Sequence, residues 1–189
     1  MSLYLSNLEE HNNLFDKLFL LDSEIQSAIQ LCTLAVRQHG KLMFCGNGGS
    51  AADSQHLAAE FTGRFIKDRK PLPGLALSTD SSALTCIGND YSFNDVFLRQ
   101  VQALGREGDC LVGISTSGNS ENVLRAFDAA RELGIKTIGL LGRDGGKLAS
   151  LSDVAIIVPS DVTARIQEAH ILIGHTICGG VEQSLGLVR

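Results

Sequence analysis

The sequence contains no tryptophan, only two tyrosines and only three prolines among its 189 residues. It also has no run of about 18 consecutive apolar residues, so we expect no membrane-spanning helix and no membrane partner. The first residues, MSLYLSNLEEHNN, do not contain a basic segment followed by an apolar one, which argues against a signal peptide. We therefore expect a cytoplasmic location.

Positive charge is also scarce. Lys and Arg number 16 against 21 Asp and Glu, which gives a formal net charge of −5. Binding to a phosphate backbone needs clustered positive charge, so this balance argues against a nucleic-acid partner. The length fits one domain, and 20 glycines with few aromatic residues are typical of a small-residue α/β protein.

The five cysteines are odd in number, far apart in the sequence and set among apolar residues. This pattern predicts free, buried thiols in place of disulfides or a cysteine metal site. The five are Cys32, Cys45, Cys86, Cys110 and Cys178.

The residue pattern changes at Gly40. Before it, apolar residues recur at helical spacing over residues 4–39 without Gly or Pro, which predicts two helices or one bent helix. After it, continuous apolar runs alternate with helical segments, as expected for a parallel sheet buried on both faces. The predicted strands are Leu42–Cys45, Gly74–Leu77, Cys110–Ile114, Thr137–Leu141 and Val154–Val158. The predicted helices cover residues 50–62, 81–88, 93–104, 119–133, 145–150 and 162–186.

A glycine-rich loop, GNGGSAA at residues 46–52, joins the first predicted strand to a helix. Open parallel sheets bind ligands beyond the carboxyl ends of their strands. Glycines let the backbone approach a ligand closely, and the start of a helix favours an anion. The spacing matches neither a dinucleotide nor a nucleoside triphosphate fingerprint, and an ordinary tight turn explains it about equally well.

A hydroxyl-rich loop, STSGNSE at residues 115–121, follows the third predicted strand. Ser115, Thr116, Ser117 and Ser120 lie at the predicted start of a helix, where uncharged donors can hold a phosphate without Lys or Arg. Helix capping is the alternative interpretation, but a cap needs only one hydroxyl. The loop therefore favours phosphate binding.

His56 and Glu60 are four residues apart on a predicted helix and therefore share one face. Such a pair can hold a zinc-like ion or exchange protons, although a solvent-facing polar stripe has the same spacing. The last helical segment adds Gln167, Glu168, His170 and His175.

The surroundings of His175 are apolar, so a charged imidazole there needs a partner or a metal, whereas a buried histidine bonded to a carbonyl needs neither. Gln167 and His175 lie roughly 12 Å apart along a helix, which leaves their convergence on one ion open.

Nearly the whole chain resembles the phosphoheptose isomerases, or sedoheptulose 7-phosphate isomerases, of the sugar isomerase (SIS) fold. The matching motifs are GNGGSAADSQHLAAEFTGR, LSTDSSALTCIGNDYSF, GDCLVGISTSGNSENV and TARIQEAHILIGH. The resemblance implies a flavodoxin-like three-layer α/β sandwich with a five-stranded parallel sheet and an N-terminal helical extension. It further implies a homotetramer with active sites at subunit interfaces, in which residues 1–39 pack in the oligomer and residues 40–189 form the SIS domain.

The same resemblance implies an aldose–ketose isomerase that converts sedoheptulose 7-phosphate to D-glycero-D-manno-heptose 7-phosphate through an enediol. This reaction is the first step toward nucleotide-activated heptose for lipopolysaccharide or other surface glycans. Glu60 would be the catalytic base, and His175 would transfer protons between oxygens. A zinc ion would be held by His56, Glu60, Gln167 and His175. Substrate contacts would come from Asn47, Gly48, Gly49, Glu60, Asn89, Asp90, Ser115, Thr116, Ser117, Ser120 and Gln167. Where some members carry Asp before the RIQE motif, this chain has Ala164.

Two other functions are to be distinguished from the enzyme. One is a non-catalytic protein of the same fold that regulates the replication initiator; such relatives lose the acidic residue and the final histidine that are present here as Glu60 and His175. The other is a sugar-sensing transcriptional regulator. It would require a DNA-binding domain, for which residues 1–39, with few basic side chains, are too short.

Overall fold

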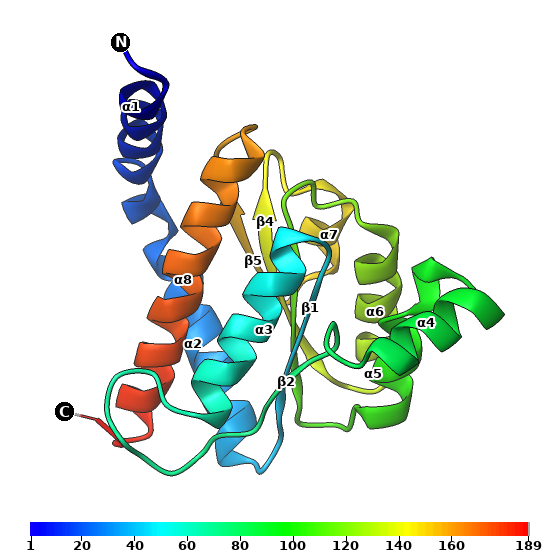
Figure 1. The fold of residues 1–189 in the computed structure, drawn as a ribbon. Coiled ribbons are helices and arrows are strands. Elements are labelled where there is room, and N and C mark those ends of the chain that lie inside the picture. Colours follow the sequence, from blue (N-terminus) through cyan, green and yellow to red (C-terminus); the bar gives the residue numbers. More distant parts are fainter. Residues whose placement is uncertain (189) are drawn as a thin grey trace.

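Five parallel strands lie at the centre of the computed structural model, which describes residues 1–188 (Figure 1). Within this range the strands are β1 (Leu42–Gly46), β2 (Gly74–Ala76), β3 (Cys110–Ser115), β4 (Lys136–Gly142) and β5 (Val154–Val158). Their order is β2-β1-β3-β4-β5, and every pair is parallel. The chain leads from β1 to β2 on one side and from β3 to β4 on the other, so the strand order reverses between β1 and β3. The loops after these two strands therefore open onto the crevice at the carboxyl edge of the sheet.

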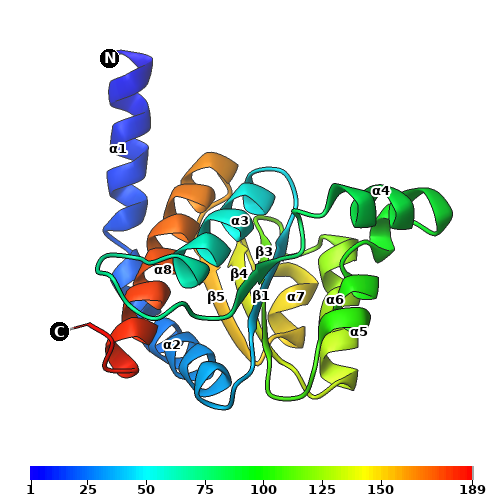
Figure 2. The same cartoon turned by 60° about the horizontal axis from the view of Figure 1, so that its bottom comes forward.

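Helices cover both faces of the sheet, as Figures 1 and 2 show. One face carries α2 (Asp22–Arg37), α3 (Gly49–Thr62) and α8 (Thr163–Ser184), and the other carries α4 (Ser81–Asp90), α5 (Leu98–Leu104), α6 (Glu121–Glu132) and α7 (Gly146–Leu151). Leu42 and Phe44 point into the first core, whereas Met43 and Cys45 point into the second. The strands are continuously apolar because both faces are buried, and the predicted fold class is confirmed.

The helical N-terminus consists of two α-helices. The first, α1 (Leu3–Phe15), is joined to α2 by a short 3-10 helix, η1 (Leu18–Leu21). Figures 1 and 2 show α1 extending away from the sheet. Several large apolar side chains of α1 are exposed. No helix within residues 1–188 combines the length and the apolar character needed to cross a membrane.

Two expectations from the sequence were wrong. Residues 93–104 do not form one helix. They divide into the 3-10 helix η2 (Phe93–Asp95) and α5. Cys86 is exposed, unlike the other four thiols, because it lies on the solvent side of α4 and contacts Asp90. All five cysteines are free, as predicted.

His170 fixes the middle of α8 to the end of β4. The side chain is fully buried, and its Nε2–H donates to the Leu141 carbonyl over 2.9 Å. The carbonyl-bonded core histidine that the apolar segment predicts is therefore His170 and not His175. Burial lowers the pKa of His170 to about 4, so its imidazole is neutral at physiological pH.

This buried imidazole should make the protein lose stability in acid. An unfolded histidine has a pKa of about 6.5, so protons favour the unfolded chain as the pH falls from there toward about 4. Urea unfolding with a chelator present should show a loss of up to about 3 kcal/mol over this range. The His170→Gln variant keeps a donor for Leu141 but cannot titrate, so its pH dependence should be weaker. Parallel pH profiles for the two proteins would contradict this account.

Candidate functional site

A cluster of three metal-ligating side chains joins α3 to α8. His56 and Glu60 come from α3, and His175 comes from α8. His56 Nε2 lies 3.1 Å from Glu60 Oε1 and 3.2 Å from His175 Nε2. The spacing predicted the α3 pair, and the family resemblance added His175. The structure brings this third side chain to the pair from a segment more than one hundred residues away.

The geometry of this cluster fits a divalent cation. Ligand atoms about 2.1 Å from a tetrahedral zinc ion lie about 3.4 Å from one another, close to the two separations measured here. The His56 side chain is 48% exposed and that of Glu60 20% exposed, so the cluster is open on one side. Two imidazoles and one carboxylate with an open side are a donor set that could hold a metal ion and still admit a ligand.

Gln167, the fourth predicted metal ligand, lies two turns before His175 on α8. Its side-chain amide is packed against Gly49, where a Cβ would overlap it. Like Gly49, Gly174 of α8 leaves room for a side chain of the other helix, since a Cβ there would overlap the Leu57 side chain of α3. Glycines at both levels therefore let α3 and α8 approach closely, and this approach brings His56 and His175 together. The Gln167 amide, in contrast, lies at Gly49, seven residues before His56 on α3.

The glycine-rich loop forms the turn between β1 and α3. Gly48 has a φ of +56°, a conformation that side chains with a Cβ rarely adopt. Asn47 is held by a reciprocal pair of amide hydrogen bonds with Asn122 of α6, 2.9 and 2.8 Å long. Asn122 is 3% exposed. This pair ties the loop after β1 to the helix after β3, across the point where the sheet connections diverge.

The hydroxyl-rich loop lies between β3 and α6. Ser115 Oγ is 2.9 Å from Ser120 Oγ and 3.4 Å from Ser117 Oγ. Ser120 is the N-cap residue of α6, yet its side chain forms no capping hydrogen bond. The hydroxyls therefore gather at the helix start without serving as caps, which favours their use for an anion. Thr116 lies in the same loop.

Asn89 and Asp90 are exposed at the end of α4, where Asn89 Nδ2 donates to Asp90 Oδ1 over 2.7 Å. Figures 1 and 2 place α4 far from α8, on the other side of the sheet. The structure therefore does not bring these two predicted substrate contacts to the His56 cluster within one chain.

Sequence reasoning missed two polar residues beside these groups. Asn122 lies two residues after the N-cap serine, Ser120, and looks like an ordinary residue of α6 in the sequence. Asp53 lies one turn before His56, and its Oδ2 is buried with no partner in the described part of the chain. Burial raises the pKa of Asp53, whereas the charge of His56 opposes this rise. Both residues lie within the motifs that carry the resemblance, but no spacing of either residue singles it out without the fold.

The fold is that of an α/β protein of the SIS type, and comparison with known proteins agrees. The SIS domain family matches residues 8–142. A phosphoheptose isomerase from Nitratiruptor is 56% identical over 178 residues, which are 94% of this chain and 95% of the relative. One from Clostridium acetobutylicum is 56% identical over 162 residues, 86% of this chain and 83% of the relative.

Solved structures give the same result. Phosphoheptose isomerase GmhA from Neisseria gonorrhoeae superposes with a TM-score of 0.91 at 47% identity, covering 95% of this chain and 97% of that one. A phosphoheptose isomerase from Francisella tularensis has a TM-score of 0.79 at 38% identity, covering 94% and 98%. The chain belongs to the phosphoheptose isomerase family of enzymes, which confirms the family that its motifs indicated.

Proposed function

We propose that this enzyme converts sedoheptulose 7-phosphate to D-glycero-D-manno-heptose 7-phosphate through an enediol, and so supplies heptose for surface glycans. The observation that supports it most is the His56–Glu60–His175 cluster, in which a partly exposed carboxylate lies within 3.1 Å of an imidazole. Family membership supports the substrate class. A cytoplasmic location stays a prediction.

Glu60 is the proposed base. Aldose–ketose isomerisation moves a proton from the carbon beside the carbonyl to the neighbouring carbon, and a carboxylate that reaches both carbons can carry it. His175 would move the second proton between the two oxygens, since an imidazole both accepts and donates near neutral pH. The two side chains come from adjacent helices, so a sugar lying over the open side of the cluster would meet both.

The hydroxyl-rich loop would hold the phosphate. Ser115, Thr116, Ser117 and Ser120 offer donors at the start of α6, where the helix dipole adds positive potential. The backbone of residues 47–49 and the side chain of Gln167 would face the sugar. Fixing the phosphate orients the reacting end of the substrate and so lowers the entropic part of the barrier.

His56, Glu60 and His175 would hold one zinc ion per chain, with Gln167 as the fourth proposed ligand. When bound, the ion would polarise the substrate carbonyl and stabilise developing negative charge. Glu60 and His175 have both roles in this proposal, so ligation and proton transfer compete for the same atoms.

Assembly into a homotetramer would complete the site. Leu3, Tyr4, Leu5 and Leu8 of α1 are 41–79% exposed, and Phe19 and Leu20 of η1 are also exposed. Burial of such a set against other copies is favourable. In this assembly residues 1–39 pack between subunits, the rest forms the SIS domain, and a neighbour's α4 supplies Asn89 and Asp90.

Glu60→Gln should lower kcat by a factor of about 10²–10⁴, because the amide cannot accept the substrate proton. The aldose product formed from sedoheptulose 7-phosphate is followed by NMR, with and without a chelator. Glu132→Gln, at an exposed position of α6, is the control and should keep normal activity. Near-normal turnover by Glu60→Gln would refute the assigned role. An assembled wild-type protein that forms no product would favour the non-catalytic binding protein instead.

His175→Gln should reduce bound zinc and activity together, because one of two imidazole ligands is lost. Loss of a group that only orients a metal ligand typically lowers metal affinity by about 10–100-fold, and loss of a ligand should cost at least as much. Elemental analysis of the purified protein measures the metal, and His39→Asn is the matched control at an exposed histidine. Unchanged zinc in His175→Gln would show that His175 is not a ligand.

The double variant Leu5→Glu/Leu8→Glu should break the assembly, because charges would enter the proposed interface. Light scattering coupled to size exclusion should report a smaller species, and turnover should fall with it. Glu9→Ala on the same helix is the control and should remain tetrameric. A monomeric wild type, or a tetrameric double variant, would contradict the proposed packing of α1.

A further inference from the structure

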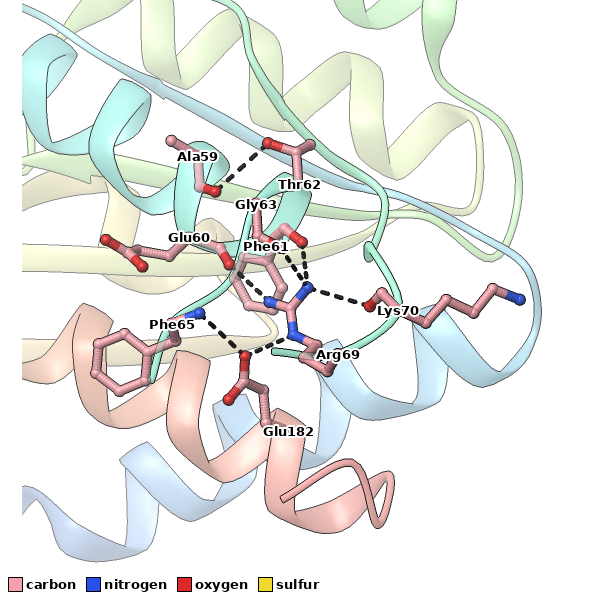
Figure 3. Close-up of polar contacts among 9 residues, drawn as sticks. All are labelled: Ala59, Glu60, Phe61, Thr62, Gly63, Phe65, Arg69, Lys70 and Glu182. Carbon is pink, nitrogen blue, oxygen red and sulfur yellow. Dashed lines mark hydrogen bonds and ion pairs between the residues drawn. The ribbon is translucent and has the colours of Figure 1, made fainter. Parts of the chain in front are cut away.

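The loop from residue 63 to residue 73 crosses the end of α3 and contacts the last turns of α8 (Figure 3). Arg69 lies at its centre. Its side chain is only 2% exposed, and it forms an ion pair with Glu182 of α8, whose side chain is 1% exposed. Neither residue was singled out by the sequence, and the proposed chemistry uses neither.

Arg69 holds the C-terminal turn of α3. Its Nη2 donates to the Glu60 carbonyl over 2.6 Å, and its Nη1 donates to the Phe61 carbonyl over 2.8 Å. Carbonyls at the end of a helix lack helical partners, and a positive charge there is favourable. The backbone that carries the candidate base is therefore fixed by a guanidinium from the following loop, as Figure 3 shows.

Glu182 connects this turn to α8. Its Oε1 accepts from Arg69 Nε over 2.6 Å and from the backbone N–H of Phe65 over 3.3 Å. Glu182 lies seven residues after His175, two helical turns further along the same stripe of α8. The Phe65 ring in turn packs against the His175 ring, with 5.3 Å between ring centres. One carboxylate thus links the backbone of Glu60, through Arg69, to the imidazole of His175, through Phe65.

Stability alone explains this ion pair poorly. Charges buried in a protein lose their hydration, and their mutual attraction often does not offset that loss. Glu182 Oε2 is also buried without a hydrogen-bond partner in residues 1–188. A pair of apolar side chains would fill the same space at lower cost, but it would not fix the direction of the two carbonyls and the Phe65 amide.

We propose that Arg69 and Glu182 are positioning residues whose ion pair holds the Glu60 turn of α3 in register with His175 of α8. The inference rests on the proposed roles of Glu60 and His175. The pair acts on the proton-transfer and metal-binding end of the site, whereas the phosphate would be held by the loop at residues 115–120. Disturbing the pair should therefore change kcat and metal affinity more than KM.

The test replaces the pair by Arg69→Met/Glu182→Met in the full-length assembled protein. Two methionines restore an apolar filling without leaving a buried charge, so the variant should fold with a Tm equal to or above that of the wild type. We expect kcat to fall by at least about tenfold with KM within about twofold, and zinc affinity of the metal-free protein to fall by at least about tenfold. Competition with a chromophoric chelator measures that affinity without reference to activity.

Arg69→Lys provides a second variant. It keeps the charge but lacks the planar fork that reaches four backbone carbonyls and a carboxylate at once, so its kcat should also fall. The matched control is Asp109→Asn. Asp109 is 3% exposed and pairs with Lys41 at the amino end of the sheet, so its loss should lower Tm but leave kcat and zinc affinity unchanged.

The outcomes separate the two proposals. A double variant that folds normally and keeps wild-type kcat and zinc affinity overturns the positioning role. The role is also overturned if the double variant loses no more kcat and zinc affinity than Asp109→Asn does. If the wild type forms no product, the proposed function fails, and the zinc competition still decides whether the pair positions the cluster. Weaker zinc binding in the double variant supports the inference, and unchanged binding overturns it.

Discussion

Helices α3 and α8 lie side by side over one face of the sheet, and their separation determines where every candidate ligand falls. Gly49 admits the Gln167 amide, Gly174 admits Leu57, and further along the imidazoles of His56 and His175 meet at 3.2 Å. A Cβ at either glycine would overlap one of these side chains, so a larger residue there would disturb the contact between the two helices. The Arg69–Glu182 ion pair lies at the far end of the same contact. Backbone packing and polar contacts therefore act on one parameter, the distance between two helices.

A chain with a net charge of −5 can still offer a phosphate a favourable position. The loop after β3 gathers serine hydroxyls at the start of α6, and none of the groups involved is cationic. Helix dipoles act over about one turn, so the overall charge of the molecule matters less than the local arrangement of donors. The Asn47–Asn122 amide pair then holds this loop and the glycine-rich loop in a fixed relation.

Much of this fold could be predicted from the sequence, because a sheet buried on both faces leaves continuous apolar runs. Each strand lies within one residue of its predicted limits. The break between η2 and α5 and the exposure of Cys86 were not predictable, since both depend on how α4 projects from the domain. The spacing of His56 and Glu60 identified two of the three residues of the cluster. Arg69 and Glu182, 113 residues apart, carry no local signal, because their relation exists only after α8 has docked on α3.

The cluster is open on the side where one chain provides no cover. The His56 side chain is 48% exposed, and a groove beside His175, about 490 Å³ in volume, runs between α2 and α8 toward Gly179 and Gly180. Proton transfer to carbon is helped when water is excluded, since electrostatic interactions strengthen in a dry site. The exposed apolar residues of α1 supply a physical reason for copies to associate, and the closure of the site would follow from that association. In the proposed assembly, the same hydrophobic burial that holds the subunits together would set the dielectric in which Glu60 and His175 act.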